Sequence, residues 1–207
     1  KKVSETRATT LMDPTVNELA YYHYGVQVET NVGMSEMAYS NGMLAGNAMT
    51  VPYACKFTES EASIWTILDV NGCPGERWGA VLLGTERCMA HRNPADKNGK
   101  DELLLSPPIL MKKERCYRLR FDARAPEAYP SMSVTFGNIP ARDGQQEILK
   151  LDSLSSRLYR TYEVEIPAIT ATNLYYFGFQ SYSETGEKIP PHLLYITNVY
   201  LYEVTDP

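Results

Sequence analysis

The sequence lacks the features that mark several large classes of protein. No apolar run approaches 18 residues, so no segment is predicted to span a membrane as a helix. Lysine and arginine number 20 against 25 aspartates and glutamates, and a net charge of −5 provides no basic field to attract nucleic acid. The chain begins without methionine and without an apolar signal core, so we expect a trimmed piece of a longer protein.

The sequence also lacks the common catalytic motifs. It contains no Gly-x-Ser-x-Gly elbow, no His-Glu-x-x-His, no phosphate-binding loop and no Gly-x-Gly-x-x-Gly. Its histidines, His23, His91 and His192, share no motif, and we interpret them as surface or strand residues. We therefore predict that the protein is not an enzyme. A glycoside hydrolase stays open as an alternative, because the spacing of paired acids is set by the fold.

Cysteine is sparse. The four cysteines, Cys55, Cys73, Cys88 and Cys116, include no Cys-x-x-Cys pair, so the sequence gives no zinc pattern. Four cysteines in 207 residues are also too few for a disulfide framework. A Cys73–Cys88 bridge and free thiols are both compatible with the sequence.

The strongest pattern present is a two-residue alternation within residues 101–124. Tyr117, Leu119, Phe121 and Ala123 alternate with charged residues, which predicts a strand with one buried face and one solvated face. The preceding Ser-Pro-Pro at 106–108 interrupts an apolar run that could otherwise form a helix.

Similar patterns recur along the rest of the chain after Thr50. The predicted strands are 53–58, 64–69, 78–84, 86–91, 102–110, 115–124, 131–137, 146–151, 159–166, 173–182 and 193–204. Turn residues separate them, and the one window compatible with a helix is 58–64. We therefore predict an all-β protein, an antiparallel β-sandwich of jelly-roll type spanning residues 47–207.

Residues 1–46 are expected to form a separate segment. Tyr24, Val26 and Val28 alternate with Gly25, Gln27 and Glu29, and an Asn/Gly/Ser loop follows at 31–41. This pattern resembles the last part of a fibronectin type III domain. A complete domain of that type needs two sheets, so the resemblance implies a partial domain that docks on its neighbour or stays partly disordered.

Residues 51–204 resemble the cleaved-adhesin domain, also called choice-of-anchor J, a MAM-like jelly roll. The landmarks, in order, are Pro-Tyr-x-Cys-x-Phe at 52–57, Trp-Thr-x-x-Asp-x-Asn-Gly at 65–72 followed by Trp78, the segment 101–124, Tyr-x-Gly-Phe at 176–179 and Leu-Tyr-Ile-x-Asn-Val at 194–199. The resemblance implies an extracellular or outer-surface location and no catalysis. It also implies adhesion or glycan binding within a larger multi-domain bacterial protein.

Two kinds of site follow from these considerations. A sugar site needs exposed aromatic rings beside amides or carboxylates, and Trp78, Tyr129 and Tyr182 are the candidates, whereas Trp65 is expected in the core.

The resemblance also implies a structural calcium site, whose retained ligands are Asp69, Asn71 and Asp101. Thr58 and Thr197 replace acidic residues usual in such domains, so we expect this site to be unoccupied and predict no cofactor.

The sequence therefore favours a non-catalytic module that binds a glycan or a host or cell-surface protein. It is not expected to bind nucleic acid or to span a membrane. A structural spacer without its own ligand is the alternative.

Overall fold

The computed structural model describes residues 2–70, 72, 77–93, 100–126, 130–183 and 192–204. The chain divides into two compact units, Lys1–Asn47 and Ala48–Pro207. No helix formed by the described residues is both long and apolar enough to cross a membrane.

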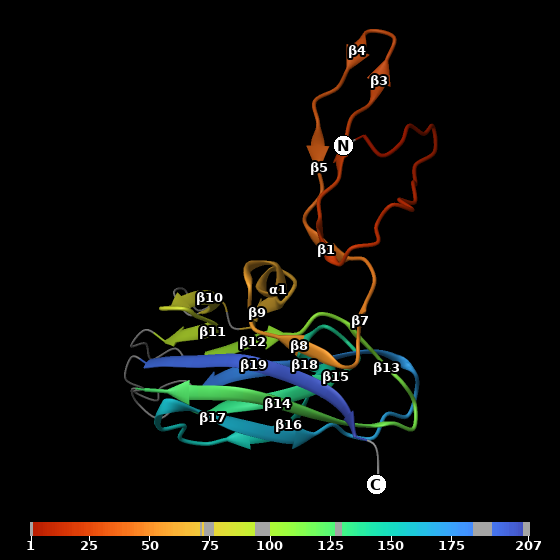
Figure 1. Ribbon diagram of the computed structural model, residues 1–207. Helices are drawn as coiled ribbons and strands as arrows, with labels where there is room; N and C mark the ends of the chain where they lie inside the picture. Colours follow the sequence, from red (N-terminus) through yellow and green to blue (C-terminus); the bar gives the residue numbers. More distant parts are fainter. Residues whose placement is uncertain are drawn as a thin grey trace. The chain divides into compact units, whose positions relative to one another are not determined.

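The first unit contains one long β-hairpin. Its strands are β1 (Ala20–Tyr22), β2 (Gly25–Val26), β3 (Glu29–Thr30), β4 (Gly33–Met34), β5 (Ala38–Tyr39) and β6 (Met43–Ala45). Strand β1 pairs with β6, β2 with β5 and β3 with β4, all antiparallel, so the three pairs are nested within one ribbon (Figure 1). At its tip Gly33 has a φ of 132°, a backbone conformation that glycine adopts without a steric penalty.

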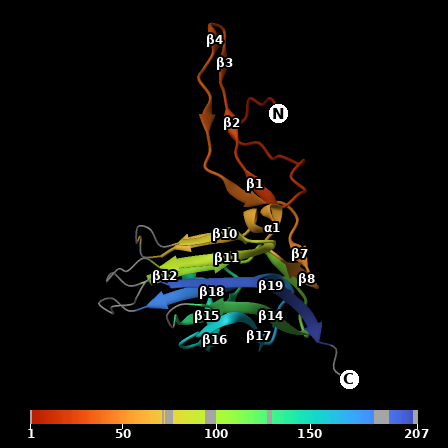
Figure 2. The ribbon, with the colours of Figure 1, turned by 60° about the vertical axis from the view of Figure 1, so that its left-hand side comes forward.

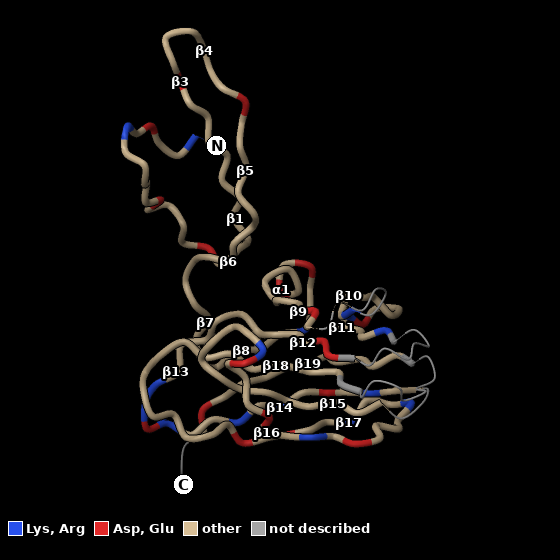
Figure 3. The backbone as a smooth tube through the Cα atoms, turned by 180° about the vertical axis from the view of Figure 1, so that it is seen from behind, with Lys and Arg blue, Asp and Glu red and all other residues tan. Residues whose placement is uncertain are grey.

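The hairpin is two-stranded throughout and poor in charge. Glu29 and Glu36 are the charged residues between positions 20 and 45, and the hairpin is accordingly drawn almost entirely in tan, the colour of uncharged residues, in Figure 3. Fibronectin type III domains bury their strands between two packed sheets, whereas the described residues of this unit form only the three two-stranded pairs of the ribbon. The likeness of residues 1–46 to such a domain stays a prediction.

The second unit is a sandwich of two sheets, which confirms the predicted all-β jelly-roll class (Figures 1 and 2). The β14 sheet has the order β10 (Arg77–Leu83), β11 (Glu86–Asn93), β19 (His192–Val204), β14 (Cys116–Ala125), β17 (Ser156–Glu165), with β8 (Tyr53–Cys55) also paired to β19. The β18 sheet has the order β16 (Gln146–Leu151), β15 (Met132–Gly137), β18 (Asn173–Ser183), β12 (Lys100–Leu105), β9 (Thr66–Asp69), joined by β13 (Ile109–Met111) and β7 (Met49–Thr50).

Strand β14 shows why this chain forms a sandwich. Tyr117, Leu119, Phe121 and Ala123 are all buried, whereas Arg118 and the other charged residues of the strand face outward. The period of two therefore places an apolar row between the sheets, as predicted. Phe121 meets Phe179 of β18 across that space, with ring centroids 4.9 Å apart in an edge-to-face contact.

The predicted strand 102–110 is two strands, separated by Pro107 and Pro108. Both β12 and β13 pair with β18, but neither proline has an N–H to donate to that ladder. Ser106 makes the connection instead: its N–H donates to the carbonyl of Phe177, and its hydroxyl oxygen accepts the N–H of Phe177 at 3.1 Å. Uninterrupted pairing over 102–110 was therefore a wrong prediction.

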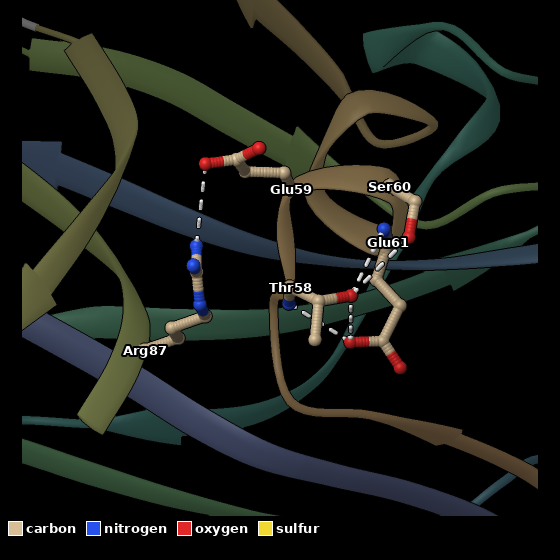
Figure 4. Close-up of polar contacts among 5 residues, drawn as sticks. All are labelled: Thr58, Glu59, Ser60, Glu61 and Arg87. Atoms are coloured by element: carbon tan, nitrogen blue, oxygen red, sulfur yellow. Dashed lines mark hydrogen bonds and ion pairs between the residues drawn. The ribbon is translucent and has the colours of Figure 1, made fainter. Parts of the chain in front are cut away.

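The helix-compatible window contains α1 (Glu59–Ser63), which begins with a capping box (Figure 4). The Thr58 hydroxyl accepts the N–H of Glu61, and the Glu61 carboxylate accepts the N–H of Thr58 at 2.9 Å. The same carboxylate accepts the Thr58 hydroxyl at 2.8 Å. A terminal guanidinium nitrogen of Arg87 on β11 lies 3.8 Å from a carboxylate oxygen of Glu59, the first residue of the helix (Figure 4). Thr58, which replaces an expected acidic residue, therefore acts as a helix cap.

We predict that Thr58→Ala destabilises the second unit by about 1 kcal/mol, because it leaves the N–H of Glu61 without its acceptor. Urea unfolding of the full chain measures the loss. The matched control is Thr58→Ser, which keeps the hydroxyl and should stay close to the parent protein. Equal stability of the alanine and serine variants would contradict the capping role.

Candidate functional site

A polar patch occupies the outer face of the β18 sheet. Val134 and Phe179 are paired across β15 and β18 and point into the core. Alternation then turns their neighbours Ser133 and Gln180, which are also paired, toward the opposite face. Next to them, Lys150 of the edge strand β16 pairs with Ser133. The strands that build the core therefore also place a row of hydrogen-bonding side chains on the outer face, where Ser133 and Gln180 are only 6% and 4% exposed.

These side chains line a pocket of about 230 Å³. Its lining residues are Ser131, Met132, Ser133, Arg142, Glu147, Lys150 and Gln180. Except for Met132, every one of them carries a side chain that can form hydrogen bonds. The Ser133 hydroxyl donates to the Glu147 carboxylate across the β15–β16 pair.

One wall of the pocket is the loop 137–145, which contains the 3₁₀ turn η1 (Arg142–Gly144). The buried Gln145 fixes this loop: its side-chain amide donates to the carbonyl of Ile139 at 2.9 Å and its oxygen accepts the Thr135 hydroxyl at 3.2 Å. The two ends of the loop also approach closely, because a Cβ on Gly137 would lie 1.8 Å from the carbonyl oxygen of Gly144. A loop packed this tightly holds Arg142 in a defined place.

Asp101 connects the loop to the sheet. Its carboxylate oxygen Oδ1 accepts a hydrogen bond from the Gln180 amide, and Arg142 Nε lies 3.5 Å from the same oxygen. Three planar groups from β12, β18 and η1 thus lie in contact, a carboxylate, an amide and a guanidinium. Two cationic side chains, Arg142 and Lys150, and two carboxylates, Asp101 and Glu147, lie in or beside the pocket, so these charges balance.

Trp78 lies in the interior instead of forming an exposed platform. Its exposure is 0%, and its indole N–H points at the carbonyl of Glu102 at 3.4 Å. Its backbone N–H donates to the Glu102 carboxylate, and the His91 ring lies 5.2 Å from the indole ring. A ring enclosed in this way presents no face to a ligand. Trp65 is buried as predicted.

Of the other two aromatic candidates, Tyr129 lies outside the described residues. The backbone of Tyr182 is in register with Asp101, at the end of β18. Its side chain is outside the described part, so its role stays a prediction.

The structure does not bring Asp69 and Asp101 together. Asp69 is in register with Glu102 on β12, and Asp101 is the next residue along that strand. Successive side chains of a strand leave opposite faces, so the two carboxylates point to opposite sides of the sheet. Asn71 lies outside the described residues, among which no group of three or more histidine, cysteine or acidic side chains could hold a metal ion. Thr197, which stands where such domains usually have an acidic residue, instead donates its hydroxyl to the carbonyl of Arg87.

The sequence did not reveal that the carboxyl group of Glu102 is buried. It is fully buried on the inner face of β12, with Oε2 3.5 Å from His91 Nε2. Burial, followed by the negative charge of Asp69, raises the pKa of this carboxyl to about 7, and the hydrogen bond from the Trp78 N–H opposes that shift. No described group donates a hydrogen bond to its other oxygen, Oε1.

The described cysteines are free thiols. Cys55 and Cys88 are buried, and burial raises the pKa of both, whereas Cys116 is exposed. Of the two alternatives left open by the sequence, the free thiol therefore holds for Cys88. Cys73 lies outside the described residues.

Sequence reasoning missed Arg142, Ser133 and Gln180. For Gln180 a signal existed, because the alternation of 175–180 already placed it opposite Phe177 and Phe179. For Arg142 none did, since its position depends on a loop that reads only as a turn.

No protein-family model matches the chain, and neither does any curated protein. Solved structures, by contrast, do match the chain. The chain is similar to the K3 cleaved adhesin domain of Lys-gingipain from Porphyromonas gingivalis, with a TM-score of 0.57 and 15% identity over 72% of this chain and 97% of that domain. The K2 domain of Lys-gingipain gives a TM-score of 0.55 and 13% identity over 75% and 100%.

A carbohydrate-binding module shares the same fold. The CBM22-1 xylan-binding domain of Xyn10C from Paenibacillus barcinonensis matches with a TM-score of 0.51 and 7% identity, over 79% of this chain and 100% of that domain. Identities this low establish the fold alone. The prediction of an adhesin-like β-sandwich is confirmed at that level.

We predict that Glu102→Gln makes the protein more stable at pH 8 but changes little at pH 4. The raised pKa means that the native state holds this proton more tightly than the unfolded state. Stability is therefore lost as the pH rises from about 4.3, the ordinary glutamate pKa, to about 7. Glutamine can accept the Trp78 N–H but cannot ionise, so it avoids this loss.

Urea unfolding at several pH values measures the difference between Glu102→Gln and the parent protein. Glu165→Gln is the control, because the Glu165 carboxylate on β17 is exposed; loss of its surface ion pair with Arg118 should cost little and should bring no gain in stability at pH 8. A stability difference that is the same at every pH would contradict the assignment.

Proposed function

We propose that residues 48–207 form a non-catalytic carbohydrate-binding module, with the pocket on the outer face of the β18 sheet as its site. The observation that carries this proposal is the contact between Asp101, Gln180 and Arg142 beside Ser133. Sugars present many hydroxyl groups, each a donor and an acceptor. Carboxylate, amide and guanidinium groups satisfy such hydroxyls in both roles.

Rigidity of the pocket supports this function. A sugar pays a cost when it is ordered on a protein, and a site that already holds its shape adds little further cost. Here strands position Gln180 and Ser133, and the Gln145 hydrogen bonds fix the loop of Arg142.

The placement of the described acids supports binding in preference to hydrolysis. Glycoside hydrolysis uses two carboxyl groups flanking the bond, one of which is kept protonated by a raised pKa. Glu102, whose pKa is raised, faces the core on the other side of the sheet from Asp101.

The similar structures fit the same proposal. One of them is described as a xylan-binding domain and two as cleaved adhesin domains. We propose that this module likewise acts in adhesion outside the cell, by holding a glycan and not a host protein. Its role would belong to a larger multi-domain protein.

We predict that the full chain binds at least one member of a broad glycan array, and that Gln180→Ala lowers that affinity about tenfold or more. Loss of one hydrogen bond with desolvation of its partner is worth roughly 1–3 kcal/mol. Titration calorimetry with the glycan found on the array gives the affinity.

Arg120→Ala, an exposed position on the outer face of the β14 sheet, is the matched control and should bind normally. If the folded protein bound no glycan on the array, the module would instead be a structural spacer. Equal losses in the two variants would place the site elsewhere.

A further inference from the structure

The size of the pocket limits what it can enclose. At about 230 Å³ it is smaller than the roughly 300 Å³ at which pockets for drug-sized ligands begin. Its described lining includes no aromatic ring on which a row of sugars could stack. A ligand bound in this pocket is therefore held mainly by hydrogen bonds, over a small contact area.

The described charges in and beside the pocket leave no surplus of positive sign. Arg142 lies against Asp101, and Lys150 Nζ lies 3.3 Å from the Asp152 carboxylate, with Glu147 also in the lining. A carboxylated sugar would bring a further negative charge to a site whose cations already have partners. A neutral sugar brings none.

Arg142 has guanidinium N–H groups that can donate hydrogen bonds to a neutral sugar. Its Nε forms an ion pair with Asp101 Oδ1 at 3.5 Å without a hydrogen bond, and its two terminal nitrogens have no hydrogen bond or ion pair with any described residue. A guanidinium presents these N–H groups in a rigid planar fork. Such a fork matches two acceptors side by side, as adjacent ring hydroxyls provide. The nitrogen of the Gln180 amide donates to Asp101, and its oxygen, which has no hydrogen bond with any described residue, can accept a hydroxyl proton.

We infer that the pocket holds one neutral sugar ring and that Arg142 selects it by donating to two adjacent hydroxyls, while Asp101 holds the guanidinium in place. This inference rests on the proposed carbohydrate-binding function and names the ligand class of the same site. Arg142 is its specificity-determining residue.

The test uses the full chain and three sets of probes. The first contains the neutral monosaccharides galactose, glucose, mannose and xylose. The second contains glucuronic, galacturonic and N-acetylneuraminic acid. The third is an oligosaccharide series built from whichever neutral sugar binds. Affinities are measured by titration between about 0.05 and 0.5 M NaCl, a range over which exposed charge interactions become screened.

We expect a neutral monosaccharide to bind with an affinity that is independent of salt and no more than a few-fold below that of its oligosaccharides. Arg142→Lys keeps the positive charge but loses the planar fork, and we expect it to bind at least tenfold more weakly. Arg120→Lys, the same substitution on the β14 sheet, should bind like the parent. Melting temperatures of both variants show whether the fold is intact.

Each contrary result has a distinct meaning. Preference for an acidic sugar, with affinity that falls as salt rises, would overturn the neutral ligand while leaving carbohydrate binding in place. Affinity that climbs steadily with oligosaccharide length would overturn the single ring. Full binding by Arg142→Lys would overturn the role of the fork. No binding of any probe by the folded protein would overturn the inference together with the proposed function.

Discussion

The two sheets of the sandwich meet through a continuous group of aromatic rings. Phe121 of β14 packs edge-on against Phe179 of β18, and Phe179 in turn contacts Phe177 and Trp65. Phe57, ahead of α1, completes the group against Trp65 at 5.1 Å. These rings come from both sheets and from the segment before the helix. Their contact therefore fixes the spacing of the layers and the position of α1 together.

The same constraint creates the candidate site. Because side chains alternate along a strand, Phe179 can enter the core only if Gln180 leaves on the other face. The partner strand β15 obeys the same rule, with Val134 inward and Ser133 outward. The outer row is thus as well positioned as the core. Binding residues supported by a packed core need little ordering when a ligand arrives.

Periodicity explains how far the sequence could predict this protein. Alternation and turn residues were enough to find most strands of the sandwich, but they missed the short β7 and failed where Pro107 and Pro108 split one predicted strand. The site was harder to predict, because the face on which a side chain lies depends on the register of its strand. Asp69 is in register with Glu102, and this offset of one residue places it on the opposite face from Asp101. Trp78 was misjudged for a related reason, since the long-range contacts of its strand decide whether its face is inner or outer.

Loop 137–145 shows what local patterns leave out altogether. Its Arg-Asp-Gly reads as a turn, and nothing nearby in sequence indicates that Arg142 reaches Asp101 on another strand. That contact arises because Gly137 and Gly144 allow close approach and because Gln145 finds partners in Thr135 and Ile139. A guanidinium placed by a loop and held by a strand carboxylate depends on tertiary structure at both ends. The specificity that we infer for Arg142 therefore rests on a loop, the kind of element that varies more in sequence than the strands it connects.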